Sequence, residues 1–446
     1  MREGSLDAPI RHPIDWQNES FYDEQALDAE LRRVFDICHT CRRCFNLCDS
    51  FPRLFDLIDE SPTGELDEVA SAGFAPVVEA CTLCDMCFMT KCPYVPPHSF
   101  DVDFPHLMLR ARAVQFKKGE TPLPDRQLAE TDRNGRLASH VAPLANWATA
   151  RGNRLTRGLM EKAAQIDRRA DLPAYASRPF AKAAAADAIA ANADAPAFGR
   201  RAVLYATCFV NFNTPGVGHA TRRVLAHNGI DLDVAYPGCC GMPKLENGDL
   251  AGVAAQARMV AAALGPAIDE GRDIIALTPS CALMLKFEWP LILPDDPAVR
   301  KLAEATFDIA EYLVDIARKE GIAPGLNALD GPVAVHFACH SRAQNQGPKA
   351  AEMLRLIPDA KVSVVERCSG HGGKWGMFLR NFDVGIKVGT PAARALAKGD
   401  PAPAHIVSEC PLAGPHLRQV METLPGAAVP DRVGHPIELV ARAYGF

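Results

Sequence analysis

The sequence lacks several features that would place it in a familiar class. No stretch of its 446 residues approaches the roughly 20 apolar residues that a membrane-spanning helix needs. The N-terminal segment MREGSLDAPIRHPIDW has no apolar core of signal-peptide length. There is no concentrated basic motif, and the net charge of −6 argues against a nucleic-acid partner. The one glycine-rich candidate, Gly216-Val-Gly218-His-Ala-Thr, lacks the third glycine of a dinucleotide-binding loop, so no flavin or nicotinamide site is visible.

Cysteine, in contrast, is abundant. Fifteen cysteines in a chain without an export signal belong in a reducing compartment, where thiolates bind metal instead of pairing as disulfides. We therefore expect a cytoplasmic protein. A length of 446 residues with 48% hydrophobic residues predicts two or three packed domains.

Eight of the cysteines lie between residues 38 and 92. The first four have the spacing C-x2-C-x2-C-x3-C of bacterial ferredoxins, in which three thiolates hold one [4Fe–4S] cube and the fourth binds another. The second four follow almost the same pattern, with Pro93 next and one extra residue before Cys92. The spacing predicts two cubes, with these ligands: Cys38, Cys41, Cys44 and Cys92 for the first, and Cys81, Cys84, Cys87 and Cys48 for the second. Zinc is the alternative, although three cysteines at intervals of three residues exceed what one tetrahedral ion needs.

Changes in composition and in predicted secondary structure divide the chain into four regions. Residues 20–120 form the cluster domain, and the segments 24–35 and 64–70 are good helix formers, which favours a helical ferredoxin over a β-hairpin type. Residues 121–200 form a helical, basic connector. In its stretch 144–166, Leu144, Trp147, Leu155, Leu159 and Met160 favour packing against a neighbouring domain over an amphipathic helix on a membrane surface.

From residue 201 onward, β-branched runs alternate with helical stretches such as 251–264, which is typical of an α/β fold with a mostly parallel sheet. The predicted buried strands are 202–206, 232–234, 274–277, 333–337, 362–365 and 405–408. The expected fold class is therefore an α domain followed by two α/β domains, at 201–325 and 330–446.

The two α/β domains repeat each other. An offset of 129 to 131 residues relates LYATC to VHFAC, PGCCG to ERCSG and LTPSC to VSEC. Each cysteine follows a predicted strand, and the carboxyl ends of parallel strands form the edge where ligands bind. The first repeat supplies Cys208, Cys239, Cys240 and Cys281, which can hold an unusual iron–sulfur cluster or form a redox-active thiol centre. The second supplies Cys339, Cys368 and Cys410, with Ser369 in place of the fourth cysteine and His340 and His371 as additional candidate ligands. A Cys3His zinc site, a degenerate cluster and a site without metal are all open.

These motifs together resemble the heterodisulfide reductase-related iron–sulfur proteins. The branch of nearest likeness contains the C subunit of anaerobic glycerol-3-phosphate dehydrogenase, and the glycolate oxidase iron–sulfur subunit is more distant. The resemblance covers most of the chain and rests on the two cysteine groups and on five segments: Leu172-Pro-Ala-Tyr, Tyr236-Pro-Gly-Cys-Cys-Gly-Met-Pro, Val335-His-Phe-Ala-Cys-His, Glu366-Arg-Cys-Ser-Gly and His435-Pro-Ile-Glu-Leu. It implies two CCG (cysteine-rich) domains that bind a noncubane [4Fe–4S] cluster or a metal. It also implies electron transfer between a flavin-containing dehydrogenase and a quinone or disulfide acceptor.

Three functions are compatible with these residues. The first is an electron-transfer subunit that relays single electrons between a partner dehydrogenase and an acceptor. The second is a self-standing reductase of a disulfide or peroxide-derived substrate at the first CCG cysteines, and the third is a non-enzymatic redox or metal sensor. Because no organic cofactor site is visible, the first function is preferred. Acidic segments at 1–37 and 49–80 indicate a face that steers a redox partner, and the basic stretch 104–170 indicates contact with a partner or with the anionic cytoplasmic face of a membrane.

Overall fold

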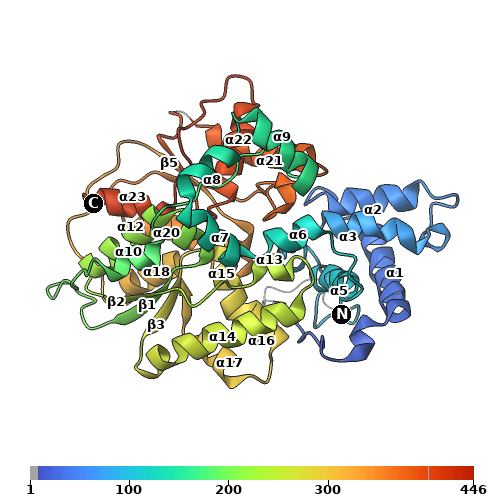
Figure 1. The fold of residues 1–446 in the computed structure, drawn as a ribbon, viewed down its shortest axis with the longest axis horizontal. Helices are drawn as coiled ribbons and strands as arrows, with labels where there is room; N and C mark the ends of the chain where they lie inside the picture. Colours follow the sequence, from blue (N-terminus) through green and yellow to red (C-terminus); the bar gives the residue numbers. More distant parts are fainter. Residues whose placement is uncertain (1–8, 400) are drawn as a thin grey trace.

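The computed structural model describes residues 9–399 and 401–446. Figure 1 shows a helical lobe, built from the N-terminal residues, beside a larger body that contains two sheets. Residues 9–128 contain no strand, so the preference for helices in this lobe is confirmed. Its helices are α1 (Glu24–Cys41), α2 (Ser50–Asp59), α3 (Ala75–Ala80), α4 (Met86–Thr90) and α5 (Phe104–Lys117).

Helix α1 shows how this lobe forms. The Asp23 side chain caps its first turn by accepting a hydrogen bond of 2.7 Å from the Ala26 N–H. Leu27, Leu31, Val34 and Phe35 are buried along one face, as an amphipathic helix requires. The first cysteines, Cys38 and Cys41, therefore lie in the last turn of a well-packed helix.

The expected helix at 64–70 is wrong. The structure has only a single 3₁₀ turn there, Leu66–Glu68. The Leu66 carbonyl accepts the Val69 N–H at 3.0 Å in this turn, and the Arg32 guanidinium donates to the carbonyls of Leu66 and Val69. Tertiary contacts thus override a weak local propensity.

The connector consists of five short helices: α6 (Leu123–Leu128), α7 (Thr131–His140), α8 (Ala142–Thr149), α9 (Arg154–Ala164) and α10 (Phe180–Ala185). The stretch 144–166 is a pair of helices and not a single one. Leu144, Trp147, Leu155 and Leu159 are 58 to 75% exposed, so the expectation that they pack against a neighbouring domain is wrong. The inner face is held by Arg157 instead, which is buried and donates to the carbonyls of Thr149, Asp167 and Ala170.

Two parallel sheets form the body. All six predicted strands are present, and β4 is an additional one that is too short to stand out in the sequence. The first sheet has the order β2-β1-β3-β4 and the second β6-β5-β7. Their bounds are β1 (Arg201–Tyr205), β2 (Asp231–Ala235), β3 (Asp273–Ala276), β4 (Thr306–Asp308), β5 (Val333–His336), β6 (Val362–Val365) and β7 (His405–Ser408). Edge strands β2 and β6 are half exposed, which corrects the expectation that every strand is buried.

Side chains alternate between the two faces of each sheet. In β1, Ala202 and Leu204 face a core shared with the second sheet, whereas Val203 and Tyr205 face the outer helices. The shared core contains α12 (Pro215–His227), α18 (Ile309–Lys319), α20 (Lys349–Leu354) and α23 (Pro436–Ala443). The outer helices are α14 (Leu250–Asp269) and α17 (Pro297–Glu304) on the first sheet, and α21 (Phe382–Ala397) and α22 (Ala413–Glu422) on the second.

The helix that closes each repeat is exchanged. Helix α18 follows β4 but packs against α20 of the second repeat, and α23 follows the second sheet but packs against α12 of the first. Both helices begin with a capping box, at Asp308 with Glu311 and at His435 with Glu438. The two α/β repeats are therefore interlocked.

Helix α14 corrects one expectation from the sequence. With 20 residues, it is long and apolar enough to cross a membrane by length and composition. Its buried residues, among them Val253, Ala257 and Val260, belong to the core that faces β1 and β3, and it packs along α17. We assign it to the protein core.

Candidate electron-transfer sites

The eight N-terminal cysteines lie in the helical lobe, where their thiols are near enough to influence one another's pKa. We call Cys38, Cys41, Cys44 and Cys92 thiol group 1, and Cys48, Cys81, Cys84 and Cys87 thiol group 2. Burial and the neighbouring thiols of Cys92, Cys44 and Cys41 raise the pKa of Cys38. In group 2, burial and the thiols of Cys84, Cys81 and Cys48 raise the pKa of Cys87.

The remaining cysteines form two more groups at the carboxyl ends of the strands. Short helices at these strand ends carry three of the seven: α11 (Cys208–Phe212), α15 (Pro279–Leu283) and α19 (Cys339–Ala343). Cys239 and Cys240 come just before a fourth short helix, α13 (Met242–Leu245). Thiol group 3 is Cys339, Cys368 and Cys410, and thiol group 4 is Cys208, Cys239, Cys240 and Cys281. Burial and the thiols of Cys368 and Cys410, among others, raise the pKa of Cys339. The distant cysteines of each repeat thus converge at one sheet edge.

The four groups form a continuous series. Burial is the main cause of the raised pKa of Cys87 in group 2, and the Cys44 thiol of group 1 is one of the neighbouring thiols that raise it further. In the same way, the Cys84 thiol of group 2 raises the pKa of Cys339 in group 3. The Cys281 thiol of group 4 raises the pKa of Cys410 in group 3. Helix α19 also packs against α4, which joins group 3 to the cluster lobe. The series runs from the helical lobe into the body of the molecule.

The donor set fits clusters of several irons. Within residues 9–399 and 401–446, no three His, Cys, Asp or Glu side chains come close enough to hold a single metal ion. A cube presents its irons at separate corners, so its thiolates need not converge on one point. Burial and neighbouring thiols raise the pKa of Cys44 to about 12, so this thiol becomes a thiolate only when a cationic group lies among the sulfurs.

Two thiols of group 4 are in direct contact. The Sγ atoms of Cys239 and Cys208 are 3.8 Å apart. This contact lowers the pKa of Cys239, whose sulfur also accepts the Gly241 N–H at 3.4 Å. Contact with Cys239, together with burial, raises the pKa of Cys208. The two thiols therefore interact directly, and each shifts the pKa of the other.

Helix α7 of the connector covers group 4, which sequence reasoning missed. Asp132 accepts the Cys239 N–H at 3.1 Å and also contacts the Tyr236 hydroxyl. The Thr131 hydroxyl lowers the pKa of Cys239 to a lesser degree than the thiols do. No spacing signal in the sequence links residues 131 and 132 to a cysteine about a hundred positions away.

The two candidate histidine ligands have other surroundings. His340 Nε2 lies 3.4 Å from the Leu83 carbonyl, in the loop that carries group 2. His371 is buried, and its ring lies 5.4 Å from that of His416 in a T-shaped arrangement. Among the described residues, neither histidine joins the thiols of group 3 in a single-ion site.

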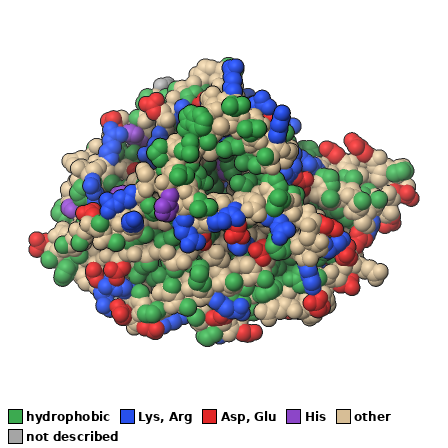
Figure 2. Space-filling view, in the orientation of Figure 1, with side chains coloured by type: hydrophobic (Ala, Val, Ile, Leu, Met, Phe, Trp, Pro, Cys, Tyr) green, Lys and Arg blue, Asp and Glu red, His purple; other side chains and the backbone are tan. Residues whose placement is uncertain are grey.

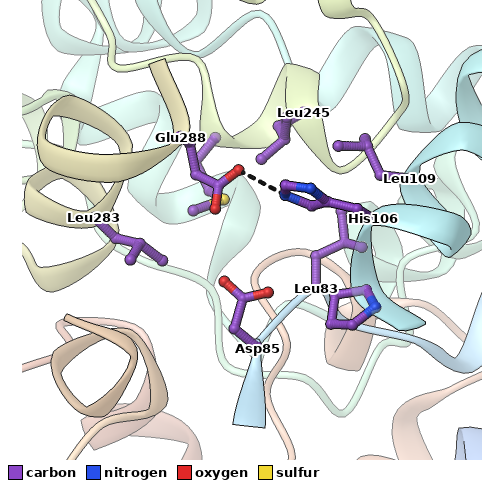
Figure 3. A pocket seen from close by; sticks show the side chains of 9 residues that line it. Leu83, Asp85, His106, Leu109, Leu245, Leu283 and Glu288 are labelled. Carbon is purple, nitrogen blue, oxygen red and sulfur yellow. Dashed lines mark hydrogen bonds and ion pairs between the residues drawn. The ribbon is translucent and has the colours of Figure 1, made fainter. Parts of the chain in front are cut away.

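A buried charge cluster fastens the lobe to the body. Arg11 forms ion pairs with Asp85 at 2.8 Å, Asp103 at 2.8 Å and Glu288 at 3.1 Å. Burial lowers the pKa of Arg11, but these carboxylates more than offset it. Figure 3 shows the neighbouring contact, in which His106 Nε2 and Glu288 face each other, at 3.2 Å, across a cavity beside Asp85. Asp85 belongs to the group 2 loop and Glu288 to a π-helical turn, Met284–Glu288, that follows α15, so this cluster holds groups 2 and 4 in fixed relation.

Surface charge follows the pattern expected from the sequence. Figure 2 shows acidic side chains on the outer part of the helical lobe. Arginine and lysine side chains are more frequent on the body in the same view. Groups 1 and 2 therefore lie in the more acidic part of the molecule.

Comparison with known proteins agrees with this geometry. Residues 202–286 match the family model of the cysteine-rich domain, CCG. The C subunit of anaerobic glycerol-3-phosphate dehydrogenase from Escherichia coli (strain K12) is 26% identical over 346 residues, which cover 77% of this chain and 82% of that protein. Lactate utilization protein A from Bacillus velezensis is 26% identical over 188 residues, 40% of this chain and 74% of that protein. The chain therefore contains a CCG domain and resembles, as its sequence predicts, the C subunit of anaerobic glycerol-3-phosphate dehydrogenase.

Proposed function

We propose that this protein is an iron–sulfur electron-transfer subunit that relays single electrons through thiol groups 1 to 4. Cubane [4Fe–4S] clusters bind at group 1 and group 2. The observation that supports the proposal is the order of the four groups, in which a thiol of each group is near enough to a thiol of the next to raise its pKa. Thiolate-bound clusters at successive points of one path are suited to moving charge one electron at a time.

Groups 3 and 4 extend the relay beyond the cubes. Group 4, with its adjacent Cys239 and Cys240, holds a noncubane [4Fe–4S] cluster. Group 3 has three thiols and Ser369, and a degenerate cluster or no metal suits it better than a zinc site, because its histidines lie elsewhere. The electron donor is a flavin-containing dehydrogenase, since the relatives include a dehydrogenase subunit, and the acceptor is a quinone or a disulfide.

A second function has one specific observation in its favour. The sulfurs of Cys208 and Cys239 are in van der Waals contact at 3.8 Å, and they must approach to about 2 Å to form a disulfide. Without a cluster, this pair can form an S–S bond, releasing two electrons and two protons to a disulfide substrate that is reduced to two thiols. Iron analysis separates the two functions, because a cluster at group 4 uses the sulfurs that the exchange needs.

A cysteine substitution tests the relay. We expect Cys44→Ser to remove one cubane signal from the EPR spectrum of the dithionite-reduced protein and to lower iron by about four atoms per chain. Electron delivery from the partner to the acceptor should fall sharply, because group 1 is the end of the series. The matched control is Cys410→Ser, which should retain both cubane signals. Full electron flux in Cys44→Ser, or anaerobically purified protein without iron and acid-labile sulfide, would contradict the relay.

We also propose that the protein lies on the cytoplasmic face of a membrane. An apolar patch is formed by α7, α8, α9 and the residue between α7 and α8. It consists of Leu137, Val141, Leu144, Trp147, Leu155 and Leu159, each at least 50% exposed. Exposed Arg136, Arg154 and Lys162 lie on the same helices, a combination typical of helices that rest on anionic lipid.

Vesicle binding checks the membrane contact. Vesicles containing phosphatidylserine should bind the protein and shift the Trp147 fluorescence to shorter wavelength. We expect Leu155→Glu with Leu159→Glu to weaken the partitioning at least about tenfold, because two apolar side chains lose their place in the lipid. Leu123→Glu is the control, since Leu123 is 65% exposed but lies on α6, outside the apolar patch. Equal partitioning of the double variant and the control would rule out this surface.

A further inference from the structure

A pocket of about 270 Å³ lies where the connector meets both α/β repeats. One wall is the segment 170–174, and the others come from α11, the turn between α11 and α12, the segment before α21, and α22 with the two residues after Cys410. Phe209 follows Cys208 of group 4, and Pro411 and Leu412 follow Cys410 of group 3, so the pocket adjoins the inner end of the thiol series. A second cavity of about 330 Å³, which Cys410 itself lines, shares Asp171 and Pro415 with it.

One polar group in this pocket has no partner. His416 is only 5% exposed and lines the pocket, and its Nε2 has no hydrogen-bond partner among the described residues. Burial lowers the pKa of His416 to about 4, although the Gly385 carbonyl acts in the opposite direction. The ring is therefore neutral at pH 7, and the nitrogen that faces Gly385 carries the proton. Nε2 is left as a buried hydrogen-bond acceptor, which is costly unless a ligand satisfies it.

The rest of the lining indicates what that ligand is. Leu172, Pro173, Phe209, Met377 and Leu412 supply apolar contacts, and Asp171, Asn213, Thr214 and Gln419 add polar groups to the wall. An apolar ring that carries hydroxyl groups fits both kinds of wall and the acceptor. His371, the other ring in the pocket, is likewise neutral, because burial lowers its pKa to about 3.

The pocket is joined to the apolar patch. The wall segment is fastened to α8 by Asn146, which donates to the Tyr175 carbonyl at 2.9 Å and accepts the Tyr175 N–H at 2.7 Å. It is fastened to α9 by Arg157, which donates to the Ala170 carbonyl at 2.7 Å. Figure 2 shows hydrophobic side chains around a hollow on the face where α8 and α9 lie. A ligand dissolved in lipid can enter at this place.

We propose that this pocket binds the ring of a hydroquinone, whose hydroxyl group donates a hydrogen bond to His416 Nε2. The proposal rests on the relay proposed above and gives a binding site for its quinone acceptor. Reduction of the quinone takes two electrons, delivered singly by the reduced iron–sulfur groups, and two protons from water, and it forms two O–H bonds. Because Nε2 accepts and does not donate, the pocket binds the quinol more tightly than the quinone and so favours the reduced product.

Calorimetric titration of the anaerobically purified full chain with menadiol tests the site. The dimethyl ether of menadiol, which lacks the O–H donors, should bind the unaltered protein about tenfold more weakly. His416→Phe should weaken menadiol binding by a similar factor and abolish the difference between menadiol and the ether. The matched control, His405→Phe, lies at the opposite end of β7 from Cys410 and should bind as the unaltered protein does.

A second variant tests the pocket in case His416→Phe does not fold. Ala174 is exposed at the rim of the pocket, so Ala174→Trp should fold normally and block menadiol by filling the entrance. Menadiol binding that is unchanged in both variants overturns the proposal. Normal cubane EPR signals with no menadiol binding refute the pocket alone. His416-dependent binding to a chain without iron upholds the pocket and refutes the relay.

Discussion

Arg11→Met is expected to destabilise the folded protein by about 3–5 kcal/mol, the range for removing one partner of a buried ion pair. The substitution leaves Asp85, Asp103 and Glu288 facing one another, with His106 as the remaining cationic partner in the cluster. Arg11 also lies over the Phe88 ring at 4.5 Å, a contact that methionine keeps only in part. Urea unfolding of the holoprotein, monitored by circular dichroism and by loss of the cluster absorbance, measures the effect.

The control for this variant is Arg33→Met. Arg33 pairs with Glu30 one helical turn away, and both side chains are well exposed, so we expect a loss of less than about 1 kcal/mol. The local consequence should differ as well. In Arg11→Met the cluster absorbance should be lost at a lower urea concentration than the helical signal of the α/β body, because the substitution loosens the lobe first. Equal unfolding midpoints for the two variants would show that the buried ion pairs of Arg11 contribute no more to stability than a surface ion pair does.

The second large effect is acid lability. Burial lowers the pKa of His336, His416 and His435 to about 4, and that of His371 to about 3. Below the ordinary histidine pKa of about 6.5, these histidines are protonated in the unfolded chain but stay neutral in the folded chain. Their contribution to the free energy of unfolding is therefore complete above pH 6.5 and is lost as the pH falls. Each such histidine contributes about 1.4 kcal/mol per pH unit in that window.

Other buried groups act with the opposite sign. The raised pKa of Glu409, about 8, and of Asp308, about 6, follow chiefly from burial and favour the folded state at lower pH. His106, whose raised pKa reflects Asp103 and Glu288 overcoming burial and Arg11, also contributes stability that is lost as the pH rises. The four buried histidines have pKa values lowered from about 6.5 to between about 3 and 4, so their protonation differs between the folded and unfolded chains across the whole interval, and we expect a net loss of stability between pH 6 and pH 4.5.

The histidine effect can be isolated with His435→Asn. His435 Nδ1 accepts the Ile437 N–H at 3.2 Å as the cap of α23, and asparagine is a good replacement for a cap but does not titrate. The slope of unfolding free energy against pH should therefore fall by about 1.4 kcal/mol per unit, while stability at pH 7.5 changes little. An unchanged slope would mean that His435 is protonated in the folded protein.

The sequence predicted the regular parts of this molecule because their signals are local. Runs of β-branched residues identified six of the seven strands, and cysteine spacing identified which thiols gather at each sheet edge. The charge cluster could not be predicted, since Arg11 and Glu288 are 277 positions apart and neither residue stands out in its own segment. The same holds for His416, whose significance depends on a wall formed by residues 170–174.

Two expectations failed for a common reason. The segment 64–70 has helical propensity, but Arg32 binds its backbone. The apolar residues of 144–159 were expected to pack against a neighbouring domain, but Arg157 occupies the inner face of these helices. In both places a single arginine satisfies several backbone carbonyls and decides the local structure. Propensity and hydrophobic pattern contain no information on such contacts.

The exchange of α18 and α23 limits how this protein can be divided. A fragment that ends before β5 would leave the apolar side of α12 without its cover, and a fragment that begins there would leave α20 without α18. Neither half can be excised as an independent module, even though the two resemble duplicated copies. We therefore expect the two repeats to fold and unfold as one unit, and the geometry of thiol groups 3 and 4 to depend on that unit.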